Sequence, residues 1–307
     1  MEMRQAFAYE IDKYMSKNDD IVLINADLAK PNGLSEISKK YPERCINVGI
    51  AEQNMASIAA GMSSYGFIPF IFTFTPFATR RICDQIAISI AYANQNVKIV
   101  GTDPGISAEY NGGTHMSVED IGVLRSIPNI VIFEPVDNIQ LKKALPQILN
   151  FDKPLYIRMF RKTLPDVFTQ DYNFDLFKAD VLKEGNDVTI ICSGIMVQEV
   201  LEAEKRLSDF GISAEIINVH TIKPIDKDTI IKSSGKTRHV VTAENHNIIG
   251  GLGSAVSEVL SQNCPTILKC IGINDIFGQV GKMPYLKQEY GMDSQSVVNG
   301  VLEVLKK

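Results

Sequence analysis

The chain has 307 residues, of which 45% are hydrophobic and 22% are charged, and its formal net charge is -5. This composition is typical of a soluble globular protein that is long enough for two domains, each with its own core. The negative charge and the lack of a long basic run argue against a nucleic-acid partner, and no apolar stretch is long enough to span a bilayer.

The first 150 residues alternate short β-rich runs with helical runs. A helix is expected over residues 1–15, where alternating charges argue against a targeting peptide. Strands are expected over 20–28, 68–74, 96–103 and 130–137, and helices over 55–66, 79–94, 117–129 and 138–149. This alternation favours a mostly parallel sheet with helices on both faces.

The pattern loosens near residue 162, and we expect a linker over 166–182. A second α/β run follows, with strands over 187–194, 213–222, 239–246 and 266–275 and helices over 196–211, 227–236, 252–263 and at the C-terminus. The fold class is therefore α/β, with two doubly wound domains over 1–165 and 183–307. The five cysteines are scattered without a CxxC pair, which suits free thiols in a reducing cytoplasm.

Glu52 is the one charged residue between Cys45 and Thr79. A carboxylate in so apolar a region is expected to be partly buried, which is unfavourable unless a partner stabilises the charge. Two interpretations remain open. Glu52 either begins a helix and binds its own backbone amides, or it is a functional acid directed at a ligand nitrogen.

Phe74, Phe77 and Arg80 follow one another at intervals of three, so on one helical turn they would share a face. That face either packs into the core or stacks on a flat ring. Further on, the loop 101–115 contains four glycines and ends at His115. Glycines let backbone approach a small ligand closely, and the histidine is either a satisfied loop residue or a proton carrier.

Six segments follow one another along the chain: "DLAKPNG", "NVGIAEQNM", "TFTPFATRRICDQI", "GGTHMSVEDIGVLRSIPN", "IKPID" and "ENHNIIGGLGSAV". Taken together and in this order, they resemble the C-terminal half of transketolase. The resemblance implies a transketolase pyrimidine-binding domain followed by a transketolase C-terminal domain. It further implies one polypeptide of a split, two-subunit transketolase. The partner would carry the diphosphate-binding domain, in an α2β2 assembly.

The resemblance implies thiamine diphosphate as cofactor, with Mg2+ or Ca2+ held by the partner subunit. Glu52 matches the acid that hydrogen-bonds the far nitrogen of the aminopyrimidine. Phe74 and Phe77 match residues that stack on the pyrimidine, Arg80 falls where many transketolases have an aromatic residue, and Asp27 matches an acid near the thiamine. The apolar surroundings of Glu52 would strengthen its bond to the ring.

The resemblance also indicates the substrate side. His115 matches the histidine that donates to the substrate oxygen and transfers protons. Arg4 and Arg161 match the two arginines that bind a sugar phosphate, and Lys30 lies in the segment where a serine is usual. The catalytic residues are thus expected to be Glu52 and His115, and no metal ligand is expected in this chain.

Two residues depart from the family pattern. Asp103 stands where a phosphate-contacting histidine is usual and would repel phosphate, and Asn111 replaces the acid that binds the hydroxyl next to the carbonyl. These departures favour an unphosphorylated sugar, a sugar whose anion sits elsewhere, or one joined to a nucleotide. A shifted alignment through the loop, or tolerated drift with the same substrate, would also account for them.

Two other functions fit related domains. One is a subunit similar to deoxyxylulose-phosphate synthase or to a 2-oxoacid dehydrogenase, and the other is a non-catalytic scaffold partner. In the second domain "GGLGSA" is either a phosphate-binding loop or, as we expect, a tight turn that opens a helix. Residues 244–246, "ENH", are expected to serve the fold or an interface instead of catalysis.

Overall fold

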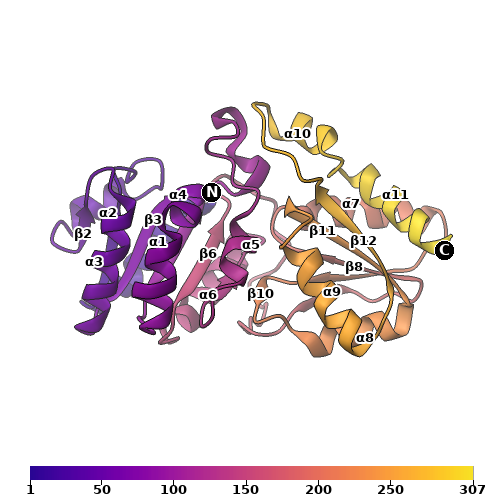
Figure 1. The fold of residues 1–307 in the computed structure, drawn as a ribbon, viewed down its shortest axis with the longest axis horizontal. Coiled ribbons are helices and arrows are strands. Elements are labelled where there is room, and N and C mark those ends of the chain that lie inside the picture. The colour runs from indigo at the N-terminus through magenta and orange to yellow at the C-terminus, as the bar shows by residue number, and fades with distance from the viewer. Residues whose placement is uncertain (307) are drawn as a thin grey trace. The chain divides into compact units, whose positions relative to one another are not determined.

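A computed structural model describes residues 1–306. The described chain packs into two units, one formed by residues 1–104 and 123–176 and the other by residues 105–122 and 177–306. The stretch 105–122, which the sequence pattern grouped with the first domain, packs with the second unit instead. Figure 1 follows the chain through both units.

The first unit is built on a parallel sheet in which six strands follow the order β5-β6-β4-β3-β1-β2. The strands are β1 (Ile21–Asn25), β2 (Cys45–Asn47), β3 (Ile68–Phe74), β4 (Lys98–Thr102), β5 (Val131–Phe133) and β6 (Leu155–Met159). Four of them, β1, β4, β5 and β6, are buried at every position. Burial on both faces explains their nearly continuous apolar runs.

Helices cover this sheet, and α1 (Met3–Met15) packs against α6 (Asn138–Leu149) while α3 (Glu52–Ser64) packs against β3. The short helix α2 (Ser35–Lys40) follows β1. Helix α5 (Asp120–Arg125) contains the boundary between the units and is shorter than the helix expected over 117–129. The doubly wound α/β architecture predicted from the sequence is confirmed.

The helix expected over 79–94 is not a regular α-helix, because the 3-10 helix η1 (Arg80–Ile82) and the π-helix η2 (Gln85–Tyr92) take its place. The short helix α4 (Thr75–Ala78) precedes them. Pro76 lies in the first turn of α4, where its missing N–H leaves no hydrogen bond unmade. Thr79 then leaves helical geometry, with φ -129° and ψ -85°, and a new helix, η1, begins at Arg80.

The second unit has a five-stranded sheet with the order β12-β11-β8-β9-β7, in which only the edge strand β7 runs antiparallel to its neighbour. Its strands are β7 (Asp180–Lys183), β8 (Val188–Cys192), β9 (Ala214–Asn218), β11 (His239–Asn247) and β12 (Ile267–Ile273), and β10 (Thr221–Lys223) follows β9. Its helices are η3 (Gly105–Asn111), α7 (Met196–Asp209), α8 (Lys227–Thr237), α9 (Leu252–Asn263), α10 (Met283–Glu289) and α11 (Ser294–Leu305).

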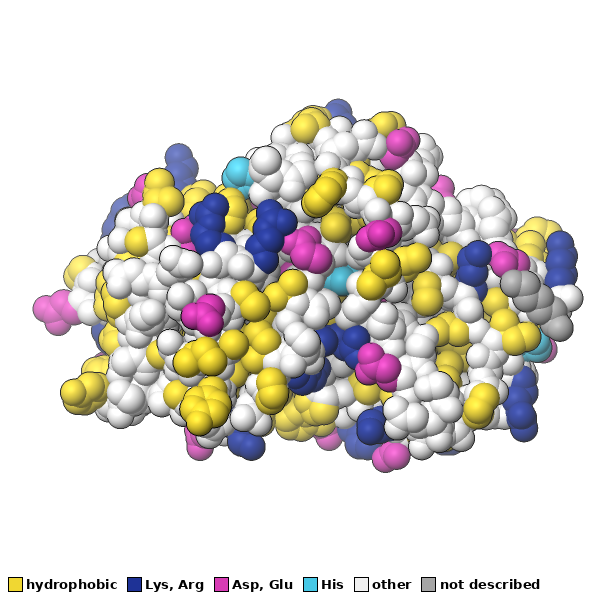
Figure 2. Space-filling view, viewed as in Figure 1, with side chains coloured by type: hydrophobic (Ala, Val, Ile, Leu, Met, Phe, Trp, Pro, Cys, Tyr) yellow, Lys and Arg dark blue, Asp and Glu magenta, His cyan; other side chains and the backbone are white. Residues whose placement is uncertain are grey.

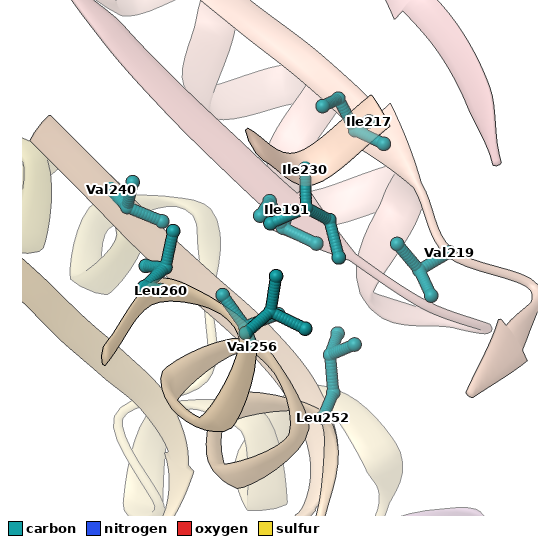
Figure 3. Packing of buried hydrophobic residues seen from close by; sticks show 9 residues of the cluster. Ile191, Ile217, Val219, Ile230, Val240, Leu252, Val256 and Leu260 are labelled. Carbon is teal, nitrogen blue, oxygen red and sulfur yellow. The ribbon is translucent and has the colours of Figure 1, made fainter. Parts of the chain in front are cut away.

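Helix α7 packs against α11, and α8 packs against α9. In Figure 1 the second pair lies on one side of this sheet and α11 lies on the other. Figure 3 shows the core beneath α9, where Val256 and Leu252 lie on the side of Ile191 of β8 and Ile230 of α8, and Leu260 lies beside Val240 of β11. These side chains are at most 2% exposed, so the helices are held by apolar burial.

The "GGLGSA" turn binds a carboxylate from its own unit. Glu244 of β11 accepts hydrogen bonds from the backbone amides of Leu252 and Gly253, at 2.6 and 2.8 Å. A Cβ at Gly251 would lie 1.9 Å from the same carboxylate, so only glycine fits there. The turn therefore opens α9 around Glu244, and an internal acid occupies the position that an external phosphate would need.

Within residues 1–306 no helix is long and apolar enough to cross a bilayer. The same residues contain no group of three or more His, Cys, Asp or Glu side chains arranged to hold a metal ion. All five cysteines are free thiols. On the face shown in Figure 2, acidic and basic side chains are interspersed with apolar ones.

Candidate active site

Glu52 is the first residue of α3, and its side chain is only 5% exposed. Its Oε1 accepts a hydrogen bond from Nη1 of Arg81 at 2.8 Å. The Arg81 guanidinium also lies over the Phe77 ring, with 3.8 Å between Cζ and the ring centroid. One arginine thus joins the buried acid to an aromatic face, and this contact satisfies the charge of Glu52.

The two phenylalanines come from different elements, since Phe74 ends β3 and Phe77 lies in α4. They therefore do not lie on one helical turn, but their rings are 6.4 Å apart and both are partly exposed. Arg80, which lies in η1, is exposed. Two half-exposed rings beside a buried acid can hold a flat ring that carries an N–H group.

A second ion pair also joins an arginine to a buried carboxylate next to a phenylalanine ring. Nη2 of Arg161 lies 2.8 Å from Oδ2 of Asp103, and Asp103 is 1% exposed. The Arg161 guanidinium lies 5.5 Å from the centroid of the Phe74 ring. Asp103 follows β4 and Arg161 follows β6, which are neighbouring strands, so the carboxyl edge of the sheet brings them together.

Arg4 and Arg161 both donate to the carbonyl oxygen of Pro31, at 2.7 and 3.4 Å. Arg4 is also paired with Glu2 at 2.7 Å. Lys30 and Arg4 line a surface hollow of about 400 Å³. The two arginines predicted to bind an anion are therefore adjacent, but each already faces a carboxylate.

Asp27 lies between β1 and α2 and adopts the left-handed backbone conformation, with φ 60°. Its amide donates to Oδ1 of Asn47 at 2.9 Å, and Nδ2 of Asn47 lies 3.3 Å from Oδ1 of Asp27. The exposed Asp27 is therefore fixed by a neighbour at the end of β2. A short polar side chain tolerates this backbone conformation better than a bulky one.

Asn111 and His115 belong to the second unit. His115 is partly exposed, and its Nδ1 lies 2.9 Å from the hydroxyl of Thr114. The loop that carries both residues is held on two sides within this unit: the amide of Ile106 donates to Oδ1 of Asn245 at 3.0 Å, and the amide of Met283 donates to Oε1 of Glu109 at 3.1 Å.

Seven of the predicted site residues lie in the first unit and are linked by contacts or line the same hollow: Glu52, Phe74, Phe77, Arg4, Lys30, Asp103 and Arg161. Asn111 and His115 belong to the other unit. Sequence reasoning missed Arg81 and the Pro31 carbonyl. The signal for Arg81 was present, because it directly follows Arg80. Which of two adjacent arginines faces Glu52 depends on the break at Thr79, which the apolar pattern does not reveal.

Comparison with known proteins assigns the chain to a family. The family "Transketolase, pyrimidine binding domain" matches residues 1–167, and "Transketolase, C-terminal domain" matches residues 177–297. The chain is 47% identical to the 6-deoxy-6-sulfo-D-fructose transketolase subunit SqwH of Clostridium sp. (strain MSTE9), over 99% of this chain and 95% of that protein. It is 39% identical to a putative transketolase C-terminal section of Methanocaldococcus jannaschii, over 99% and 96%.

A solved structure of a split-gene transketolase, an inactive beta4 tetramer, superposes with a TM-score of 0.91 at 40% identity and covers all of this chain and 98% of that one. A 1-deoxy-D-xylulose-5-phosphate synthase of Pelotomaculum thermopropionicum is 34% identical, but this chain matches only 47% of it. The chain belongs to the transketolase family and corresponds to the C-terminal subunit of a split, two-component transketolase.

Proposed function

We propose that this transketolase subunit completes a thiamine diphosphate site with Glu52, Phe74 and Phe77 and transfers a two-carbon ketol unit from a sulfonated ketose to an aldehyde. When bound, thiamine diphosphate supplies the nucleophilic carbon and the electron sink for breaking a bond next to a carbonyl. The observation that carries the cofactor part is the buried Glu52 carboxylate, joined through Arg81 to the Phe77 ring. An aminopyrimidine needs such an acceptor and such a stacking face, so these residues fit it.

The partner subunit would bind the diphosphate and its Mg2+ or Ca2+, in an α2β2 assembly. Two relatives that this chain matches nearly end to end support such a division. One is named a transketolase subunit and the other a C-terminal section. The solved relative is named as an inactive tetramer of β chains, which supports inactivity of this chain alone. The five free cysteines suit a cytoplasmic enzyme.

The charge balance around the two arginines supports a sulfonate instead of a phosphate. Arg4 faces Glu2 and Arg161 faces Asp103, so two cations are offset by two carboxylates. A phosphate group is close to a dianion at neutral pH, whereas a sulfonate is a monoanion. At an effective dielectric constant of about 20, an extra negative charge about 8 Å from Asp103 is unfavourable by roughly 2 kcal/mol, so the monoanion is preferred.

The remaining predicted residues have roles that follow from their chemistry. His115 would move a proton at the substrate oxygen, and Asn111 would bind the hydroxyl next to the carbonyl as both donor and acceptor. Lys30 would bind the anionic end of the sugar in the hollow that it lines with Arg4. Asp27 and Arg80 would approach the thiamine.

A donor panel tests the substrate assignment. The reconstituted pair of subunits, with thiamine diphosphate and Mg2+, is given 6-deoxy-6-sulfofructose, fructose 6-phosphate or fructose with one aldehyde acceptor. We expect the highest kcat/KM for the sulfonated donor. Asp103→Asn removes the repelling charge, so kcat/KM for the phosphorylated donor should rise about tenfold relative to the sulfonated one.

Asp209→Asn is the matched control, because Asp209 is an exposed aspartate at the end of α7. It should leave the ratio of the two donors unchanged. The combined Asp103→His and Asn111→Asp variant should favour phosphorylated donors further. A wild-type preference for fructose 6-phosphate over the sulfonated sugar would contradict the proposal.

A further inference from the structure

We propose that Arg81 is a positioning residue of the cofactor site, which holds the Glu52 carboxylate by one oxygen and the Phe77 ring by one face. The inference rests on the proposed function, because it concerns the same pyrimidine-binding residues. The family resemblance did not point to Arg81, and the role follows from its two contacts: 2.8 Å to Oε1 of Glu52 and 3.8 Å to the Phe77 centroid.

Arg81 connects elements that the sheet alone does not align. Glu52 begins α3, Phe77 lies in α4, and Arg81 lies in η1 after the break at Thr79. The side-chain amide of Gln53 also reaches the carbonyl oxygen of Arg81, at 3.5 Å, so the same region of α3 contacts the arginine twice. The arginine therefore sets the position of the acid relative to the ring.

Only arginine can make both contacts in this way. Its guanidinium is planar, so it can stack on an aromatic face while its N–H groups bind a carboxylate in the same plane. A lysine would keep the charge but lose the stack, and a glutamine would keep a donor but lose the charge. Arg81 binds Oε1 of Glu52, which leaves Oε2 to be directed at a ligand N–H.

The two adjacent arginines, Arg80 and Arg81, differ in their surroundings. The sequence pattern selected Arg80 as the residue near the cofactor, and Arg80 is exposed in η1. Arg81 is 43% exposed at its side chain, yet it is the one that reaches the 5% exposed Glu52. The ion pair holds Oε1 of Glu52 at 2.8 Å from Nη1 of Arg81.

Cofactor binding, measured by calorimetry on the reconstituted two-subunit apoenzyme, tests the proposal. Arg81→Gln should weaken binding of thiamine diphosphate about tenfold or more, and Arg81→Lys should restore part of the loss. In a Glu52→Gln background the Arg81→Gln effect should shrink to less than half, because the arginine acts through the acid. Lys205→Gln, at an exposed lysine of α7, serves as the charge-matched control.

A cofactor analogue makes the test specific to the ring nitrogen. In the pyridine analogue of thiamine diphosphate that lacks the nitrogen facing Glu52, no hydrogen bond to the acid forms. Binding of this analogue should therefore be nearly insensitive to Arg81→Gln. A merely structural role would weaken both compounds equally, and that result would overturn the proposal.

Other results are equally decisive. Tighter cofactor binding by Arg81→Gln would mean that the arginine occupies the place of the ring, and an equal loss in Arg80→Gln would assign the role to Arg80. If Arg81→Gln fails to fold, the Arg81→Lys variant carries the same comparison. Absence of cofactor binding by the wild-type pair would refute the proposed function, whereas unchanged binding by Arg81→Gln and Arg81→Lys would refute this inference alone.

Discussion

Lys98 is a fully buried charged residue at the first position of β4. Its Nζ donates to the carbonyl oxygens of Phe151 and Lys153, the latter at 2.9 Å. Burial lowers the pKa of Lys98 from 10.5 to about 7, and the nearby Asp152 only partly opposes this shift. The lysine therefore makes the stability of the first unit depend on pH in a range where most carboxylates are already ionised.

The direction of that dependence follows from the pKa values. Between pH 7 and pH 10.5 the unfolded chain keeps the Lys98 proton and the folded chain releases it, so the free energy of unfolding should rise with pH. This stability is lost as the pH falls toward 7. We expect the urea midpoint of the wild type, relative to that of Lys98→Met, to be higher at pH 9.5 than at pH 7.

Lys39→Met provides the comparison for Lys98, since Lys39 is 72% exposed on α2. This variant should follow the wild-type pH dependence in parallel. If the gap between wild type and Lys98→Met stays constant over the same range, Lys98 does not titrate there.

At single positions, the sequence predicts that a residue needs a partner better than it predicts which residue the partner is. Glu52 was recognisable because a lone carboxylate in an apolar region needs a partner, and its burial at 5% agrees. Its partner Arg81 could not be told from the adjacent Arg80, because the helical phase is lost at Thr79. The carbonyl partners of Lys98 lie more than 50 residues away and follow α6, so no local pattern in "NVKIV" indicates them.

The loop of residues 105–116, which carries the predicted catalytic residue His115, packs closely against its own unit. A Cβ at Gly113 would lie 2.6 Å from the carbonyl oxygen of Gly278, and one at Gly105 would lie 2.2 Å from Oδ1 of Asn245. Gly105 also has φ 53°, which disfavours other residues. The loop that carries His115 is thus locked to its unit by close backbone approach.

Gly105→Ala should therefore displace this loop. We expect turnover of the reconstituted enzyme to fall at least tenfold and its melting temperature to drop by several degrees, because the new methyl group meets Asn245 in a strained backbone. Cofactor affinity should change less, since Glu52 and Phe77 are on the other unit. Steady-state kinetics, calorimetry and thermal melting together separate these effects.

Gly61→Ala in α3 is the matched substitution. Nothing lies within 4 Å of a Cβ at Gly61, and alanine is the better helix former by about 1 kcal/mol. This variant should be as stable as wild type or more so. Normal turnover in Gly105→Ala would show that the loop tolerates the shift and that its position does not limit catalysis.

Elements themselves were predicted well where apolar periodicity is strong, as in β1, β3, β4, α7 and α9. They were predicted poorly after β3, where α4 precedes the expected helix and η1 and η2 replace it after the break at Thr79. The reason is physical: Arg80, Arg81, Asp84 and Gln85 interrupt the apolar pattern there, so periodicity does not distinguish α-, 3-10 and π-helical turns. Local backbone geometry decides between them.

For the whole molecule, the β/α alternation was enough to predict two doubly wound domains, because parallel strands require helical crossovers. The grouping of residues 105–122 with the second unit was not predictable, since it depends on distant contacts such as those of Asn245 and Gly278. Such contacts join residues that are far apart in the sequence, so local patterns do not predict them.

At the scale of the whole molecule, we expect the activity of this chain to depend on a partner subunit. The chain alone, with thiamine diphosphate and Mg2+, should show no ketol transfer, and addition of a subunit carrying the diphosphate-binding domain should restore it. A coupled assay for the released aldehyde measures both. Activity of the chain by itself would contradict the split-subunit assignment, and pyruvate decarboxylation by the pair would favour a synthase-like or dehydrogenase-like reaction instead.

Glu52 and the loop with Asn111 and His115 are carried by separately packed units, each with its own sheet. The core of one unit therefore supports the loop that we propose to contact the sugar, while the core of the other supports Glu52, the proposed cofactor acid. We therefore expect substitutions at Asn111 to change the preference for the hydroxyl next to the carbonyl while the affinity for thiamine diphosphate is retained.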